Sequence, residues 1–324
     1  MGVLASTDFL EEGFGFGVSL GALRVPSDSR SIDRMRPAVT PRDASTILLL
    51  RPADPFEVFL VRRHQKSQFM GGMYVFPGGK LDEQDLDPEL ESLCYGLSAA
   101  EAAEILGDEL PPSRALGLFV AAVRETFEEA NILLAVNGQG QPIDPEVATL
   151  RLAQERARLQ NGETSLTVVL RSLGWQVDLS RIRYLAHWVT PPVEPRRFSA
   201  RFFVVETPSQ QRAVHDARET TDGQWLSPAL ALEHLADPRH QIQMAPPTIR
   251  ILERMGRCKT LSEALQISPH APVHTQAPRL VLNDGVACLV LDGDPLHPDK
   301  PGAVRDRFEM RDARWVSIQD NVVS

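Results

Sequence analysis

The segment from Arg124 to Leu134, RETFEEANILL, constrains the fold of this chain more than any other stretch. On a helix, positions i, i+3 and i+4 lie within about 100° of one another, so Glu125, Glu128 and Glu129 form one patch. The opposite side carries apolar residues at helical spacing: Val120, Val123, Phe127, Ala130 and Leu134. The pattern therefore predicts a helix with its apolar face in a core and its carboxylate face in solvent or in a cleft.

Clustered carboxylates need an explanation, because like charges at i and i+4 destabilise a helix by a few tenths of a kcal/mol. Arg124 together with solvent is one way to offset the repulsion. A hard divalent cation is the other, because Mg²⁺ and Ca²⁺ prefer carboxylate oxygens. The segment alone leaves both explanations open.

Composition limits the partners of the chain. Its 324 residues suit one large domain or two small ones, and 43% of them are hydrophobic. A net charge of −9 argues against binding nucleic acid or an anionic membrane through bulk electrostatics. Three scattered cysteines without metal-ligand spacing suit a reducing compartment, and the first residues lack a secretory pattern. We expect a cytoplasmic protein, free of nucleic acid and membrane, that is able to form a homodimer.

The chain divides into three parts on pattern. Residues 1–42 are weakly patterned and are expected to be a flexible arm, and residues 258–324 contain three short β-like runs, RLVLND, VACLVLDG and ARWVSI. Between them, residues 43–257 mix strand and helix signals, with insertions predicted at about 86–112 and 138–180. Apolar runs at 45–51 and 56–63 predict a hairpin, and those at 181–190 and 200–207 predict two further strands.

Two short motifs resemble the halves of the Nudix box, whose full pattern is G-x5-E-x7-R-E-U-x-E-E-x-G-U, with U apolar. FPGG places Gly79 at the first glycine, and RETFEEANI supplies the second half from Arg124. Asp85 stands in place of the usual first Glu, and Arg124 follows Gly79 by 45 positions instead of 14. Asn131 replaces the last glycine, and Asn is the next best residue for the left-handed end of a helix.

The interruption resembles the Nudix branch that contains the mammalian peroxisomal coenzyme A diphosphatase. The likeness covers roughly residues 43–257 and includes Trp188-Val-Thr-Pro191 and the pair Glu219-x5-Trp225. It implies an α/β fold, in which a Nudix-type mixed β-sheet is sandwiched between helices, with helical insertions and a β-rich C-terminal extension. We expect the insertion at 86–112 to form a flap that shapes the substrate pocket, because both of its ends are anchored near the site, with the helices of 144–173 as a second lid.

The resemblance implies hydrolysis of a phosphoanhydride in a nucleoside diphosphate linked to another group, with Mg²⁺ or Mn²⁺ as cofactor. It assigns the metal to the carboxylates of Glu125, Glu128 and Glu129 and to the Gly79 carbonyl. Arg124 would hold the glutamates in place. Glu219 matches a distal glutamate that in some relatives binds metal or acts as general base, although a solvated loop acid is the plain alternative. Glu125, Arg124 and Glu219 are thus the catalytic candidates.

The resemblance implies that the substrate is a small-molecule nucleotide. Its phosphates would meet Arg62, Arg63 and Arg197, together with Gly78 of the glycine turn. The aromatic candidates for stacking on a base are Phe69, Tyr74 and Trp188, for each of which core packing is the alternative. Coenzyme A or acyl-coenzyme A is the substrate that the interrupted box implies. A dinucleotide or ADP-ribose, or a non-catalytic nucleotide-binding Nudix module, are the alternatives.

Overall fold

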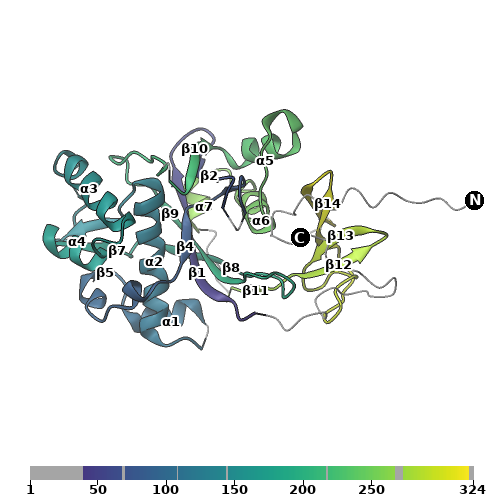
Figure 1. The fold of residues 1–324 in the computed structure, drawn as a ribbon, viewed down its shortest axis with the longest axis horizontal. Coiled ribbons are helices and arrows are strands. Elements are labelled where there is room, and N and C mark those ends of the chain that lie inside the picture. The colour runs from purple at the N-terminus through teal and green to yellow at the C-terminus, as the bar shows by residue number, and fades with distance from the viewer. Residues whose placement is uncertain are drawn as a thin grey trace, which may run out of the picture.

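A mixed β-sheet lies at the centre of the computed structural model (Figure 1), which describes residues 39–67, 70–107, 109–143, 145–216, 218–266 and 273–320. Its strands run in the order β10 (Thr220–Leu226), β2 (Glu57–Arg63), β1 (Arg42–Arg51), β9 (Phe198–Glu206), β8 (Arg183–Val189) and β11 (Thr275–Gln276). Two short strands extend it: β3 (Tyr74–Val75) pairs with β2, and β4 (Gly78–Lys80) pairs with β1. The β1–β9 pairing is parallel and the β1–β2 pairing antiparallel, so the predicted mixed sheet is confirmed.

The strands predicted from apolar runs are present. The runs at 45–51 and 56–63 form the β1–β2 hairpin, with Leu50 opposite Val58. The runs at 181–190 and 200–207 form β8 and β9, which pair antiparallel. Their apolar residues face both sides of the sheet, as expected for strands buried between two layers.

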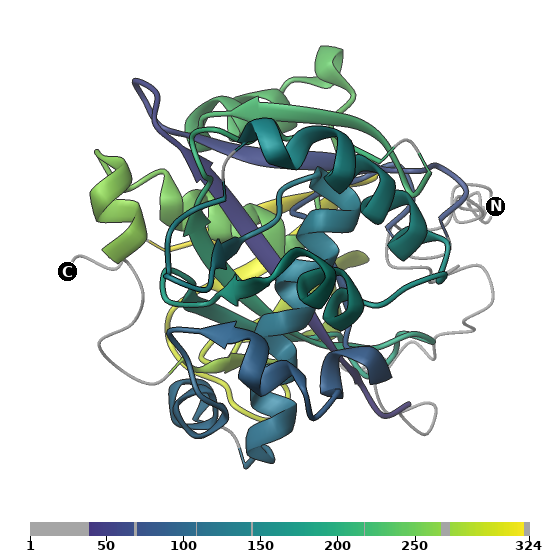
Figure 2. The ribbon, with the colours of Figure 1, turned by 90° about the vertical axis from the view of Figure 1, so that its left-hand side faces the viewer.

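Alternate residues of each central strand enter different cores. Ile47 and Leu49 face one core, whereas Leu48 and Leu50 face the other. Figures 1 and 2 show the first side, here called the helical face. It carries α1 (Ala99–Leu106), α2 (Pro112–Ala130), α3 (Pro145–Gln160), α4 (Leu166–Leu173) and a small sheet ordered β5 (Cys94–Tyr95), β7 (Trp175–Asp178), β6 (Ala135–Asn137).

The second side, here called the cleft face, is covered by later parts of the chain (Figure 1). It carries α5 (Pro228–Ala236), α6 (Pro246–Met255), α7 (Leu261–Gln266) and an antiparallel sheet of β12 (Arg279–Asn283), β13 (Val286–Val290), β14 (Asp306–Arg311) and β15 (Arg314–Gln319). Short 3₁₀ helices lie at Glu83–Leu86 (η3), Leu90–Leu93 (η4) and Pro238–His240 (η5). The three β-like runs of the tail are confirmed as β12, β13 and β15, and β14 was not anticipated.

The two ends of α2 are set by local sequence. Its last turn ends at Asn131, which adopts φ 59° and ψ 26°, so Asn131 terminates the helix in the left-handed conformation as predicted. At the other end, the helix begins at Pro112 after Pro111. Proline suits this first position because its missing N–H would have no partner within the helix.

The insertions belong to the core of the helical face. Leu90 and Ala102 from the first insertion, and Leu166 and Leu170 from the second, are buried together with Phe119 of α2. The C-terminal sheet likewise shares a core with α6 and the main sheet. Apart from its last four residues, the arm expected at 1–42 lies outside the described residues. Within the described ranges, no helix is long and apolar enough to cross a membrane.

Candidate active site

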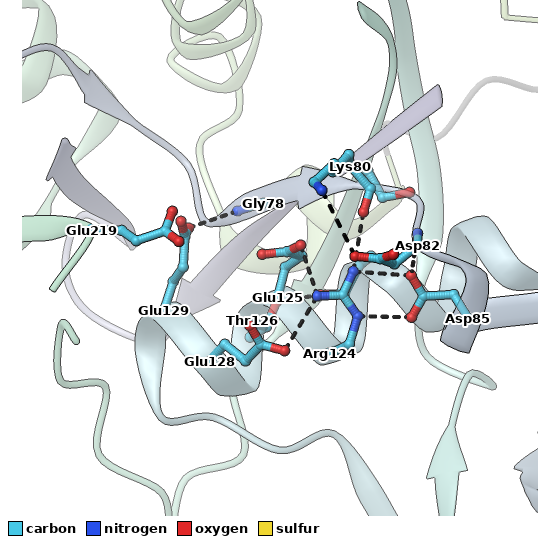
Figure 3. Close-up of polar contacts among 12 residues, drawn as sticks. Gly78, Lys80, Asp82, Asp85, Arg124, Glu125, Thr126, Glu128, Glu129 and Glu219 are labelled. Carbon is cyan, nitrogen blue, oxygen red and sulfur yellow. Dashed lines mark hydrogen bonds and ion pairs between the residues drawn. The ribbon is translucent and has the colours of Figure 1, made fainter. Parts of the chain in front are cut away.

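Arg124 lies at the centre of the acidic cluster and is itself only 3% exposed. Its Nε donates to Oδ1 of Asp85 at 2.8 Å, and its Nη2 donates to Oδ2 at 2.9 Å (Figure 3). Nη2 also donates to the Lys80 carbonyl at 3.1 Å. Asp85, buried in η3, is therefore long enough to make a bidentate ion pair in the place of the usual glutamate.

The third nitrogen of the same guanidinium faces the helix. Arg124 Nη1 donates to Glu125 Oε1 at 2.8 Å and to Glu128 Oε1 at 3.2 Å (Figure 3). Arg124 thus ties two glutamates of α2 to the loop after β4, which is the orienting contact that the sequence implied. The carboxylates line a cleft and are not on an open surface, since the Glu125 and Glu128 side chains are 13% and 20% exposed.

The glycines of β4 bring that strand against α2. The Gly78 N–H donates to Glu129 Oε2 at 2.9 Å, and Glu129 is 3% exposed. A Cβ at Gly79 would collide with the Glu125 carboxylate. A side chain at Gly79 would therefore push the strand away from the helix, which explains the Gly-Gly pair.

Thr126 occupies the position that is usually apolar in the Nudix box. It is fully buried, and its hydroxyl donates to the Ala122 carbonyl at 2.6 Å within α2. This bond satisfies the hydroxyl, so Thr126 can be buried beside Phe127 without an unpaired donor.

Burial and mutual repulsion leave the carboxylates poorly compensated. Burial raises the pKa of Glu125 to about 7 against the opposing effect of Arg124, and Glu128 raises it further. Burial likewise raises the pKa of Glu129 to about 8, with Glu125 adding to the shift, while Arg63 and the Gly78 N–H act in the other direction. The ionised forms of both carboxylates are therefore disfavoured by their surroundings.

These residues fit a hard divalent cation that is shared with a substrate. In the described part of the chain, no three acidic, histidine or cysteine side chains are placed to hold a metal by themselves. Mg²⁺ does not need such a cage, because it keeps several waters and takes further oxygens from bound phosphates. The buried, undercompensated carboxylates of Glu125 and Glu129 supply hard oxygen donors, and the Glu128 carboxylate lies beside them.

Glu219 comes to the cluster from a distant part of the chain. Its carboxylate lies beside that of Glu129 (Figure 3), and its charge raises the pKa of both Glu128 and Glu129. Its side chain is 69% exposed, and Oε2 lies 3.9 Å from Arg63 Nη2. Glu219 is therefore near enough to act on the same ligand as the α2 glutamates.

The cluster opens into a cleft of about 740 Å³ on the cleft face of the main sheet. Its acidic end is lined by Arg124, Glu125 and Glu128, with Glu219. Away from that end, most of the lining residues are small or apolar, with three arginines among them: Arg42, Ala44, Thr46, Trp188, Arg196, Arg197, Ala200, Phe202, Pro246, Pro247, Pro278 and Leu289. The cleft is thus charged at one end and largely apolar beyond it.

The expected phosphate-binding residues are only partly brought together. Arg63, Arg197 and Gly78 line the cleft, and Arg197 also donates to the Thr190 carbonyl at 2.9 Å. Arg62 is not among the described residues that line it, because its Nε donates to the Gly72 carbonyl at 3.2 Å.

Of the three aromatic candidates for stacking on a base, only one is a described residue that lines the cleft. Trp188 lines the cleft but is 4% exposed. Tyr74 is also buried, and its hydroxyl donates to Asp222 at 2.6 Å. Phe69 lies outside the described residues.

The flap prediction was wrong. Among the described residues, none from 83–123 and none from 129–187 lines the cleft, because both insertions pack into the core of the helical face. The walls come instead from the start of α6 and from the C-terminal segment, through Thr248, Pro278 and Leu289. Sequence reasoning missed these residues, since an isolated apolar residue far from the motif carries no signal of its own.

The mixed sheet between helices, and the buried arginine that ties an acidic helix to a glycine turn, match what the two halves of the Nudix box implied. The family model described as the NUDT19 Nudix domain matches residues 99–255. The crystal structure of a Nudix hydrolase from Alicyclobacillus acidocaldarius superposes with a TM-score of 0.58 and 26% identity, covering 72% of this chain and 99% of that one. These matches support a Nudix hydrolase that acts on pyrophosphate bonds, and the chain resembles the interrupted-box branch that includes NUDT19.

Two curated relatives carry the same name. The acyl-coenzyme A diphosphatase NUDT19 of Gallus gallus is 27% identical over 311 residues, which cover 80% of this chain and 80% of the relative. The Xenopus laevis protein of that name is 25% identical over 285 residues, which cover 76% and 72%. The similarity therefore extends well beyond the two halves of the box.

Proposed function

We propose that this chain hydrolyses the diphosphate linkage of coenzyme A or an acyl-coenzyme A, with Mg²⁺ or Mn²⁺ as cofactor. The observation that carries the proposal is a cleft in which the acidic side of α2 is followed by a largely apolar lining. Similarity to proteins named acyl-coenzyme A diphosphatase supports the choice of substrate. Such a substrate has the matching form, because a charged diphosphate is followed by a long, weakly polar arm.

The residues divide the chemistry among them. Glu125, Glu128 and Glu129, with the Gly79 carbonyl, would hold the cation, which when bound stabilises phosphate charge and lowers the pKa of a water. Arg124 fixes the carboxylates through its contacts with Glu125 and Glu128.

The remaining groups act on the substrate. Arg63 and Arg197 meet its phosphates by charge-assisted hydrogen bonds, and the Gly78 turn lies against them. Glu219 accepts a proton from the attacking water, whose oxygen forms the new bond to phosphorus as the P–O–P bond breaks. In coenzyme A this yields a phosphopantetheine product and 3′,5′-ADP.

The test is hydrolysis of coenzyme A, an acyl-coenzyme A, NADH and ADP-ribose with excess Mg²⁺ or Mn²⁺. We expect metal-dependent cleavage of the first two, reduced about 100-fold or more in Glu129→Gln, because losing a charged group at the reacting centre costs on this scale. Glu104→Gln on the exposed surface of α1 is the matched control and should retain full activity.

The other outcomes separate substrate from mechanism. Cleavage of NADH or ADP-ribose alone would keep the mechanism and discard coenzyme A. Cleavage of no compound, with tight nucleotide binding that Glu129→Gln leaves unchanged, would show that the acidic face of α2 does not work as a metal site.

A further inference from the structure

The carbonyl of Glu128, near the end of α2, is held by an unusual number of donors. The last four carbonyls of a helix have no partner within it. Glu128 O accepts hydrogen bonds from Arg156 Nε at 3.0 Å, from Arg156 Nη2 at 2.8 Å and from Gln160 Nε2 at 2.6 Å. Both donor residues belong to α3, in the insertion at 138–180. The insertion therefore contacts the catalytic helix from behind, away from the cleft.

The same guanidinium reaches a second segment. Arg156 Nη2 also donates to the Val214 carbonyl at 3.1 Å, and the Val214 N–H donates to the Ala130 carbonyl of α2 at 2.9 Å. Arg156 thus joins the end of α2 to the segment that leads to Glu219. Gln211 of that segment exchanges two hydrogen bonds with the backbone of Leu133, each 2.8 Å long.

The turn that presents Glu219 is fixed by Asp216. Its carboxylate accepts from the N–H of Glu219 at 3.1 Å, from the N–H of Thr220 at 2.9 Å and from the Thr220 hydroxyl at 2.6 Å. Two residues separate Asp216 from Glu219 in the sequence. A displacement of the segment at Val214 would therefore carry Glu219 with it.

The charge of Arg156 suits this location. Burial lowers its pKa, while the carboxylates of Asp216, Glu128 and Glu129 act to raise it. A cation is also favoured at the C-terminal end of a helix, where the peptide dipoles leave partial negative charge. Arg156 therefore stays bound to α2 through both hydrogen bonds and electrostatics.

We propose that Arg156 is a positioning residue that sets Glu219 against the glutamates of α2. It does so by binding the Glu128 and Val214 carbonyls at once. The inference rests on the proposed function, in which both groups act on one diphosphate. In this proposal, α3 of the second insertion holds the end of α2 and the segment before Glu219 in a fixed relative position.

Arg156→Ala tests the proposal through kinetics. We expect kcat to fall about tenfold or more, because small misplacements of catalytic groups slow the chemical step, while KM stays within about twofold. Arg158→Ala is the matched control: it removes the same charge from the same helix, and Arg158 pairs with Glu155 on the surface of α3. This control should match the wild type in kcat.

A double-mutant cycle distinguishes positioning from general support. In a Glu219→Gln background, Arg156→Ala should lower kcat by no more than about twofold, because residues that act through one another are not additive. An equal loss in both backgrounds would overturn the proposal, as would an unchanged kcat in Arg156→Ala.

Hydrogen exchange supplies a readout that does not depend on activity. In Arg156→Ala the N–H groups of Val214, Glu219 and Thr220 should exchange about tenfold faster, because their segment loses its anchor. The N–H groups of β1 should not change, and Arg158→Ala should match the wild type throughout. Unchanged exchange at these three N–H groups would contradict the positioning role of Arg156. If the wild type cleaves no nucleotide while Arg156→Ala still shows the faster exchange, the proposed function is rejected. The structural role of Arg156 between α2 and the Val214 segment is then retained.

Discussion

The helical face and the cleft face of the main sheet contribute to the site in different ways. The helical face holds both insertions and most of the core around α2, but of its helices only α2 supplies described residues that line the cleft. The cleft face supplies the floor of the cleft from β1, β8 and β9, and its walls include Thr248, Pro278 and Leu289. The comparison teaches that the residues interrupting the motif support the catalytic helix, whereas distant segments shape the space for substrate.

Arg124 belongs to α2 on the helical face and also lines the cleft, so its replacement should have the largest effect. In Arg124→Met we expect the free energy of unfolding to fall by about 3–5 kcal/mol, because Asp85 is left buried without its cation. Urea unfolding followed by circular dichroism measures the change.

The exposed pair of Arg158 and Glu155 gives the control for that prediction. Arg158→Met should cost at most about 1 kcal/mol, as is usual for surface ion pairs. A similarly small loss in Arg124→Met would mean that the buried ion pair with Asp85 contributes little to stability.

Leu170→Ala tests whether the helical face acts on stability alone. Leu170 of α4 is fully buried in the core beneath α2, and its truncation should cost about 3 kcal/mol through lost contacts and a cavity. KM for the best substrate should stay within about twofold, since Leu170 lines no part of the cleft. Steady-state kinetics and urea unfolding of the same preparation check both, and a large rise in KM would break the contrast between the faces.

Ala200→Phe makes the opposite change on the cleft face. Ala200 lies on the floor of the cleft, in register with Ala44 on one side and Trp188 on the other. A phenyl ring would occupy space meant for substrate, so KM should rise about tenfold, equivalent to about 1.4 kcal/mol. The free energy of unfolding should change by less than about 1 kcal/mol, because the ring enters a cleft and not a packed core.

Its control is the same enlargement on the helical face. Ala153→Phe, at an exposed position of α3, should leave KM unchanged. Equal KM values for Ala200→Phe and the wild type would show that substrate does not pass over this part of the sheet.

The sequence predicted those parts of the molecule that depend on local pattern. The β1–β2 hairpin follows from two short apolar runs, and the acidic face of α2 follows from the spacing of Glu125, Glu128 and Glu129. Asn131 ends the helix as expected because its left-handed conformation is a local property. Asp85 was recognised in the place of the usual Glu of the box, but its ion pair with Arg124 was not anticipated.

The predictions failed where packing, and not the local sequence pattern, decided which side of the sheet a residue or segment faces. A helix such as α1 or α3 has the same sequence pattern whether it covers a cleft or a core, so both insertions were expected near the substrate. Arg62 and Arg63 are neighbours in the sequence, yet adjacent residues of a strand point to opposite faces. Arg63 therefore lines the cleft, while Arg62 binds the Gly72 carbonyl.

The sequence by itself predicted the acidic helix α2, four strands of the main sheet and the resemblance to the Nudix superfamily, since each depends on residues close together in the chain. Tertiary structure alone decided which segments face the cleft. It brought Glu219 to within reach of the α2 glutamates and placed Leu289 of the tail in the cleft lining. It also turned α3 into a support for Glu128. These contacts join segments far apart in sequence, and their energies come from burial and pairing that no local pattern encodes.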